Sequence, residues 1–248
     1  MKRALCILFI SICGWQIGLA QERKVENRPY TDLRQLHFGV VVGVHLQDVE
    51  FVNAGPQPFT RDDGIVVQTH ITTDQNRYDP GFTVGVAGEL RLNRYFQFRV
   101  APALYFGTRY LTFHNLLETN AAGMPIEHHQ EMKTAYISSA FNLIFAAPRF
   151  NNHRPYVIAG INPMINLSGR NSDYIKFKRY DLFAEVGLGC DFYLPFFKLR
   201  PELKFMFSLV NCLDTRHAEQ LRDRNMIPYA RSVSDARSHI VALSFYFE

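Results

Sequence analysis

The feature that most constrains the fold of this chain is an alternation of apolar with small or polar side chains at every second position. Successive residues of a β-strand point to opposite faces, so this period predicts strands with one apolar face. In the clearest case, apolar side chains fill the even positions from Leu182 to Phe192, opposite Asp181, Glu185 and two glycines. Eight such runs, each about ten residues long, follow one another: 37–46, 82–91, 96–106, 136–145, 155–165, 181–192, 198–209 and 238–247.

The run 155–165 leaves its parity open, because two sets of apolar residues compete for the same face. Tyr156 and Ile158 share one face, whereas Val157, Ala159 and Ile161 share the other. The pattern predicts a strand there without assigning its faces.

The connections between these runs differ in length in a regular way. Short links at 92–95, 146–153 and 194–197 alternate with long ones at 47–80, 111–133, 166–179 and 211–237. Outer-membrane barrels have short periplasmic turns and long external loops, and about ten residues suffice for a tilted strand to cross the membrane. Compact soluble domains seldom contain several long loops. We therefore expect residues 36–248 to form an all-β domain, an eight-stranded antiparallel transmembrane outer-membrane β-barrel with long extracellular loops.

A secreted ligand-binding barrel of the lipocalin type is the alternative, because alternation alone does not say which face points inward. Eight strands enclose a lumen just wide enough to be filled by side chains. The uniformly apolar face is rich in Phe and Leu and is too bulky for that space, whereas the other face carries Gly, Ala, Ser and some charges. We expect the bulky face to contact lipid and the lumen to be filled, without an aqueous channel.

The first twenty residues have the layout of a secretory signal peptide. Lys2 and Arg3 precede an apolar stretch, and Gly18-Leu19-Ala20 forms a small-x-small cleavage site. An uncleaved anchor helix is the alternative, and the polar and small residues within the stretch weaken it. We expect a cleaved signal peptide at 1–20, a polar periplasmic leader at 21–35, and integration of the remainder in the outer membrane.

Nine charged residues fall on the face that we expect to point into the lumen. A charge enclosed in a narrow barrel must be paired, because an isolated buried charge is prohibitively costly. Five basic and four acidic residues nearly balance, which favours a salt-bridged interior over a proton or substrate relay. The predicted lumen charge network comprises Glu89, Arg91, Arg99, Glu185, Asp191, Lys198, Arg200, Glu202 and Lys204.

No motif in the chain points to a metal, cofactor or catalytic site. The histidine-rich stretch 127–131 lacks the spacing of a metal-binding helix, and no phosphate-binding or nucleophile motif is present. Cys190 and Cys212 lie near opposite ends of neighbouring predicted strands, roughly 20–25 Å apart at ~3.3 Å per residue. We therefore expect no disulfide between them, since a disulfide needs a Cα separation below ~7 Å.

The fourth long connection, 211–237, is the predicted partner-contact surface. Arg and Tyr are enriched where proteins bind one another, and loops hold residues that barrel construction does not require. A solvated loop without a partner is the alternative, because four acidic residues dilute its positive charge. The net charge of the whole chain is only +4, so we expect no nucleic-acid partner. The residues singled out are Arg216, Arg222, Arg224, Tyr229 and Arg231.

Three stretches of the sequence resemble the PorT-type β-barrels of Bacteroidetes outer membranes. They are Phe38–Gly43, Arg154–Gly160, and Asp181–Tyr193 continued by Leu199–Leu203. The resemblance spans about residues 36–248, and the order and spacing of the stretches make it more specific than any one of them. It implies a non-enzymatic accessory role in type IX secretion, which moves cargo with a C-terminal secretion domain across the outer membrane. The implied partners are outer-membrane lipid and other secretion-system proteins, with no cofactor and no small-molecule substrate.

Two other functions stay open at this point. The first is a structural or adhesive barrel unrelated to secretion. The second is a hydrolase active at the outer rim, since His45, Asp48, Glu50 and His239 lie near the upper ends of the first and last predicted strands. Because these two strands close the barrel, the four side chains could be neighbours.

Overall fold

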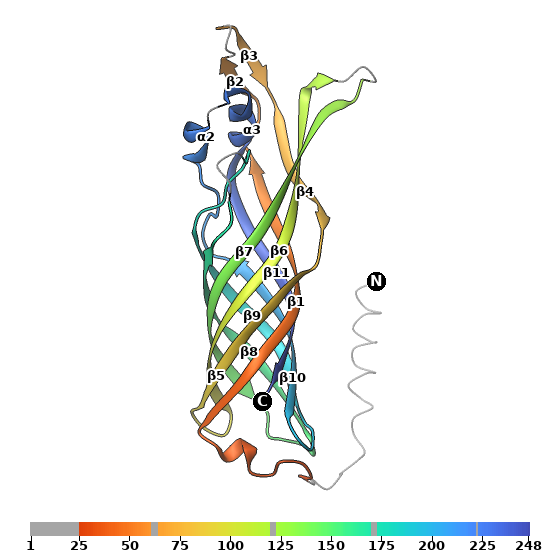
Figure 1. The fold of residues 1–248 in the computed structure, drawn as a ribbon, viewed down its shortest axis with the longest axis vertical. Helices are drawn as coiled ribbons and strands as arrows, with labels where there is room; N and C mark the ends of the chain where they lie inside the picture. The colour runs from red at the N-terminus through yellow and green to blue at the C-terminus, as the bar shows by residue number, and fades with distance from the viewer. Residues whose placement is uncertain (1–24, 61–63, 120–122, 170–172, 222) are drawn as a thin grey trace, which may run out of the picture.

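The computed structural model describes residues 25–60, 64–119, 123–169, 173–221 and 223–248, and its main body is the predicted eight-stranded barrel (Figure 1). The predicted signal peptide 1–20 lies outside the described residues. No helix among the described residues is both long and apolar enough to cross a membrane. The barrel strands are β1 (Leu36–Asn53), β5 (Gly81–Arg91), β6 (Phe96–Thr119), β7 (Pro125–Ala146), β8 (His153–Asn166), β9 (Tyr180–Tyr193), β10 (Lys198–Ser208) and β11 (Val233–Phe247).

The eight strands form a closed antiparallel ring. Each pairs with its neighbours in chain order, and β1 closes the ring by pairing with β11 on one side and β5 on the other. Val44, for example, is opposite Leu243 in one register and opposite Phe82 in the other. Closure satisfies the backbone hydrogen bonds without a free sheet edge, which is the condition for spanning a bilayer with strands. We call the end with the short turns the periplasmic end and the opposite end the extracellular end.

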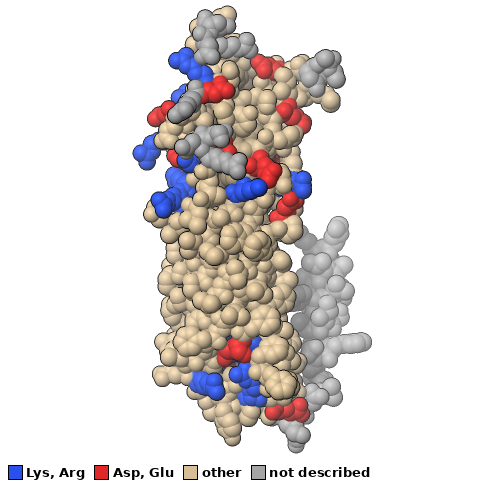
Figure 2. Space-filling view, in the orientation of Figure 1, with Lys and Arg blue, Asp and Glu red and all other residues tan. Residues whose placement is uncertain are grey.

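The faces of the strands follow the predicted parity. Phe38 on β1 is 73% exposed on the outer wall, whereas Val41 on the same strand is 2% exposed inside. On β8 the open question is settled, because Tyr156 and Ile158 are buried in the lumen and Val157 and Ile161 are exposed. On the face shown in Figure 2, charged residues lie above and below a broad belt that carries none. This belt is where a hydrocarbon layer would surround the barrel.

The long connections are more ordered than the sequence indicated. The connection predicted at 111–133 is instead a continuation of β6 and β7, which pair from Phe96↔Phe145 up to Thr119↔Pro125. These strands have 24 and 22 residues, more than twice what a membrane crossing needs. Antiparallel pairing continues above the membrane because a two-stranded ladder satisfies its own backbone. The predicted loop boundary was therefore wrong for this hairpin.

The other connections also hold short elements. The first contains β2 (Gln57–Thr60), which pairs with β3 (Val66–Thr69), and β4 (Ile71–Tyr78), which pairs with β6. The fourth contains the helices α2 (His217–Gln220), η2 (Arg224–Met226) and α3 (Ile227–Ala230). The described connections and the upper ends of the strands pack into an extracellular lobe above the belt (Figure 1).

Candidate functional site

The centre of the lumen holds a network of paired charges. Arg99 Nε donates to Glu89 Oε2 at 3.0 Å, and its other arm contacts Glu202. Arg200 reaches the same Glu89 oxygen at 2.6 Å, and Tyr156 donates to Glu202 Oε1 at 2.5 Å. Arg99 and Glu202 are 0% exposed. Shared carboxylates of this kind offset the cost of burying the charges only while every partner is present.

The network continues toward both ends of the lumen. Asp191 Oδ1 lies 2.6 Å from Arg200 Nε, and Lys204 Nζ lies 4.0 Å from Glu185 and 3.9 Å from Glu202. Lys198 pairs with Glu248 at the periplasmic end. Four acidic and four basic residues of the predicted network are thus buried together: Glu89, Glu185, Asp191, Glu202, Arg99, Lys198, Arg200 and Lys204.

Arg91 is the exception among the nine predicted lumen charges. It ends β5 at the periplasmic mouth, where it is only half-buried and its Nη1 donates to Leu33 O at 3.3 Å. Its parity is inward, but it lies at the mouth, outside the enclosed part of the lumen. Assigning Arg91 to the buried network was therefore wrong.

Tyrosines fill much of the space between the charges, a feature that the sequence interpretation missed. Tyr156 and Tyr246 are buried, with Arg200 and Arg99 stacked over their rings at 5.1 and 4.3 Å. Small residues opposite make room for them: a Cβ on Gly189 would lie 2.4 Å from the Tyr156 ring. The available signal was tyrosine at inward positions on several strands. Together these side chains fill the lumen rather than leave a channel.

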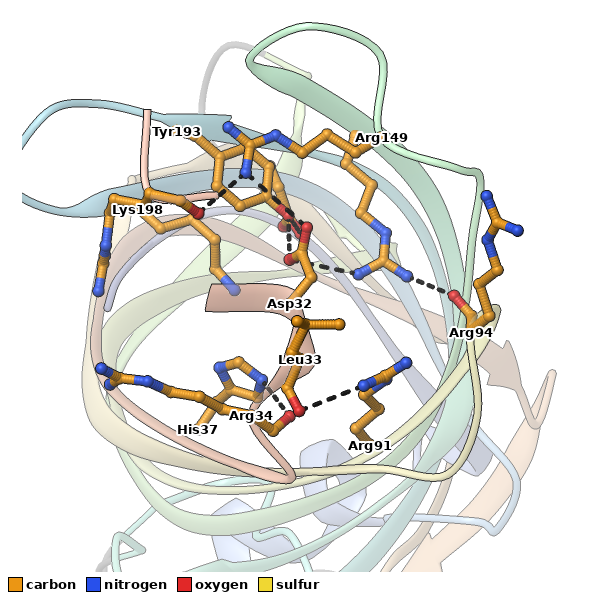
Figure 3. A network of polar contacts seen from close by, with 12 residues as sticks. Asp32, Leu33, Arg34, His37, Arg91, Arg94, Arg149, Tyr193 and Lys198 are labelled. Carbon is orange, nitrogen blue, oxygen red and sulfur yellow. Dashed lines mark hydrogen bonds and ion pairs between the residues drawn. The ribbon is translucent and has the colours of Figure 1, made fainter. Parts of the chain in front are cut away.

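The leader residues fold across the periplasmic mouth (Figure 3). A short 3-10 helix, η1 (Thr31–Leu33), places Asp32 where it accepts from Tyr193 Oη at 2.5 Å. Arg149, on the turn between β7 and β8, stacks 3.6 Å above the Tyr193 ring and donates to the carbonyls of Asn27 and Arg28. The mouth is thus covered by a strap, residues 27–34, which contacts with Arg149, Tyr193 and Glu248 help to hold in place.

Glu248 completes the contacts at this end. Its carboxylate lies 2.5 Å from His37 Nδ1 and contacts the Lys198 ammonium. Burial opposes ionisation of Glu248, but these two groups outweigh it and hold its pKa at about 2. The carboxylate is therefore charged at neutral pH and neutralises Lys198.

Replacing Arg149 by alanine is expected to loosen the strap while leaving the barrel folded. The change removes the stacking on Tyr193 and the hydrogen bonds to two strap carbonyls, and local elements held by few contacts open independently of the whole. Limited trypsin digestion should then cleave at Arg28 or Arg34 several-fold faster. Arg94→Ala, on the exposed neighbouring turn, is the matched control and should leave the cleavage rate unchanged. Equal rates in both variants would contradict this role for Arg149.

The extracellular lobe has an apolar core of its own. Leu111 and Phe113 from the upper part of β6 are 0% exposed, and they pack with Ile175 and Leu213 from the third and fourth connections. A β-bridge between Phe177 and Leu213 joins these two connections. The core rests on top of the lumen, so the extracellular end is closed as well. A loop cluster with a buried core presents a fixed surface instead of a mobile one.

The residues predicted for partner contact occupy different positions in this lobe. Arg216, Arg224 and Arg231 are exposed, whereas Tyr229 is half-buried against Phe113, with ring centroids 5.7 Å apart. Arg222 lies outside the described residues.

The two cysteines of the described chain are unpaired, as predicted. Cys190 lies half-buried on β9. Cys212 is buried in the lobe core, where its thiol lies 3.1 Å from Ala236 O. Burial raises the pKa of the Cys212 thiol to about 12, so it stays protonated and unreactive.

The four candidate hydrolase residues lie on opposite sides of the barrel wall. His45 points into the lumen, is 2% exposed, and lies 3.0 Å from Thr83 Oγ1 and 2.9 Å from Gln47 Nε2. Asp48 and Glu50 face outward on β1. Asp48 is directly opposite His239 of β11, and His239 Nε2 lies 3.5 Å from Glu50 Oε2. His45 therefore cannot act together with the other three. Among the described residues, no group of three or more His, Cys, Asp or Glu side chains could hold a metal ion.

A seam runs between β1 and β4 above the membrane. Among the described residues these two strands share no register pairs, and side chains join them instead. Gln75 Nε2 donates to Gln47 O at 2.7 Å, and Thr73 N donates to Asn53 Oδ1 at 2.8 Å. A cleft of about 550 Å³ lies here, and Asp48 caps the amide of Val49 beside it at 2.9 Å. Strand edges whose backbone groups are hydrogen-bonded by side chains are protected from pairing with another chain.

Known proteins resemble this chain at the level of a family and, more distantly, of solved structures. A family model described as outer membrane protein beta-barrel domain matches residues 19–214. No curated protein sequence matches the chain. Among solved structures, Neisserial surface protein A is 12% identical (86% of this chain, 98% of that chain, TM-score 0.42). The outer membrane protein OprG from Pseudomonas aeruginosa is 13% identical, with 86% of this chain and 94% of that chain covered and a TM-score of 0.46. Ail of Yersinia pestis, solved with the heparin analogue sucrose octasulfate, is 11% identical, with 86% of this chain and 99% of that chain covered and a TM-score of 0.36. These structural likenesses are too distant to bear on function.

Proposed function

Because the chain belongs to the outer membrane protein β-barrel domain family, we propose that it is a non-enzymatic outer-membrane accessory of type IX protein secretion. The observation that carries this proposal is the resemblance of Asp181–Tyr193 and Leu199–Leu203 to PorT-type barrels. These stretches supply Glu185, Asp191 and Arg200 of the lumen network, together with Gly189, which makes room for Tyr156. The resemblance therefore covers residues that pack the interior of this barrel.

The filled lumen favours action through surfaces. The interior is filled by side chains that are 0% exposed, such as Arg99, Arg109 and Phe183. Both ends of the lumen are covered. A folded cargo cannot pass through such a space. Under this proposal the chain acts on other secretion-system proteins, without a cofactor, through its extracellular lobe or its periplasmic strap. The exposed Arg216, Arg224 and Arg231 are the residues that we propose for partner contact.

A structural or adhesive surface protein is the second candidate. The observation in its favour is the β6–β7 hairpin, which extends far above the belt beside the rest of the lobe (Figure 1). A projecting, self-paired hairpin suits contact with a surface outside the cell. This role requires no other secretion protein.

Deletion of the gene with complementation separates the two candidates. We expect deletion to leave cargo in the periplasm, uncleaved at its secretion domain, and the intact protein to restore surface display. A variant with Arg216, Arg224 and Arg231 changed to Ser should restore it only in part, at normal barrel abundance. The matched control changes Arg94, which is exposed on a periplasmic turn outside the strap, to Ser. Normal display of cargo in the deletion strain would rule out the secretion role and favour the adhesive one.

A further inference from the structure

The extracellular lobe contains a pocket of about 340 Å³ that neither candidate function uses. Its wall combines residues from β3 and β6 with residues from the third and fourth connections, such as Val67, Asn115, Tyr174 and Met226. The pocket therefore exists only when these separate connections fold together. Its volume lies within the range of small-ligand sites, which are concave and combine apolar walls with a few polar groups.

Aromatic rings form one wall of the pocket. The centroid of Tyr229 lies 5.0 Å from that of His128 and 5.1 Å from that of Tyr174. Phe113 packs edge-on behind Tyr229, with 5.7 Å between centroids, and fixes the ring in the lobe core. Phe59 of β2 adds a fourth ring to the lining. Rigid rings in such a cluster offer π-faces at little cost in conformational entropy.

Two carboxylates are among the described residues that line the pocket, although the connection that builds much of it is rich in arginine. Glu118 and Asp223 line the pocket, and none of the described residues of its lining is Lys or Arg. Asp223 Oδ1 accepts from Asn225 N at 2.9 Å, so its carboxylate is fixed at the start of η2. Burial, and then the charge of Glu118, raise the pKa of Tyr229, which keeps this phenol neutral.

We propose that this pocket binds an organic cation: the ammonium or guanidinium head of a Lys or Arg side chain from another protein, or a quaternary ammonium group of a small molecule. Aromatic rings attract such cations through their quadrupoles, and nearby carboxylates add Coulomb attraction. The apolar residues Ile71 and Pro228 in the wall suit the methylene or methyl groups that these cations carry. Phosphate- or carboxylate-bearing ligands would be repelled.

Titration of the purified barrel with defined probes tests this site. The protein is labelled with 13C at its methionine methyl groups and placed in phosphatidylglycerol nanodiscs, because choline-headed lipids and detergents carry the group under test. Met226 lines the pocket and reports binding, whereas Met164 and Met206 in the lumen serve as internal references. The probes are tetramethylammonium, Nα-acetyl-lysine amide and Nα-acetyl-arginine amide, each against NaCl at equal ionic strength. We expect at least one of them to shift Met226 saturably and leave the two references in place.

The identity of the best probe separates the two sources of the cation. Tighter binding of the amino-acid amides indicates a protein side chain, and tighter binding of tetramethylammonium indicates a small molecule. Glucose and glucose 1-phosphate are the neutral and anionic comparisons. A saturable Met226 shift with either sugar that exceeds the shift with the cations would overturn the proposal.

Asp223→Asn should weaken binding at least about threefold, since it removes one of the two charges. Asp214→Asn is the matched control: Asp214 caps the amide of Arg216 in the same connection at 3.2 Å but does not line the pocket. Unboiled gel mobility checks that both variants fold. Equal weakening in the two variants, or no response of Met226 to any cation, would also overturn the proposal. This result would leave the secretion role untouched, because the secretion test uses other residues.

Discussion

Glu202→Lys is expected to destabilise the barrel by at least about 3–5 kcal/mol, the cost of breaking a buried ion pair by removing one partner. Glu202 is 0% exposed and contacts Arg99, Lys204 and the hydroxyl of Tyr156. A lysine there would leave two existing cations without their shared carboxylate and add a third. Because these side chains are inaccessible to bulk solvent, the repulsion would be weakly screened.

The measurement is urea unfolding of the refolded protein, monitored by the fraction that keeps the mobility of a folded barrel on an unboiled gel. Glu219→Lys is the matched control, because Glu219 is exposed on α2 and surface changes cost within about 0.5 kcal/mol. If Glu202→Lys unfolded at the same urea concentration as Glu219→Lys, the lumen network could not be the stabilising element described above.

The wall of the barrel could be predicted from the sequence because it depends on a local rule. Whether Phe38 meets lipid and Val41 the lumen follows from parity alone once the barrel size limits the lumen volume. This rule could not assign the inward and outward faces of β8, because both of its faces carry apolar residues. Its parity depends on Tyr156 reaching Glu202, two strands away, and a contact between distant strands leaves no trace in a single run of residues.

The two ends of the barrel could not be predicted for the same reason. One contact that holds the strap joins Arg149 to Asn27, more than 120 positions away, and neither residue belongs to a recognisable motif. The lobe core joins Phe113 to Tyr174 and Tyr229, which are spread over three connections. Polar leaders and long loops have no periodicity, so sequence reasoning treats them as unstructured. Here they cover the lumen at both ends.

The strap and the extracellular lobe, which cover the two ends of the lumen, bear on the proposed function. With the interior filled, the surfaces left for binding are the lobe, the strap and the outer wall. The outer wall is the lipid-facing surface in the belt, and the seam beside Asp48 is bonded by side chains. Any partner therefore meets folded elements with fixed side chains, which lose less entropy on binding than free loops would. This is why single substitutions in the lobe are informative.

Leu203→Lys is expected to destabilise the barrel by about 2–4 kcal/mol, the cost of a lysine facing lipid near the midplane. Leu203 lies at the centre of β10, faces outward and is 40% exposed. Leu209→Lys provides a control of the same chemistry at another depth, because Leu209 follows the end of β10 at the extracellular edge of the belt and is 56% exposed. Near the interface a lysine costs only about 0–1 kcal/mol, since its ammonium can reach water.

Both Leu203→Lys and Leu209→Lys are measured by urea unfolding in lipid vesicles, where the hydrocarbon thickness is defined. A large difference between them would place the centre of β10 in the hydrocarbon layer and Leu209 at its boundary. Equal and small costs would mean that the exposed face of β10 contacts water. That outcome would contradict a transmembrane barrel, whatever its strands and their pairing, because it would place the apolar belt in water.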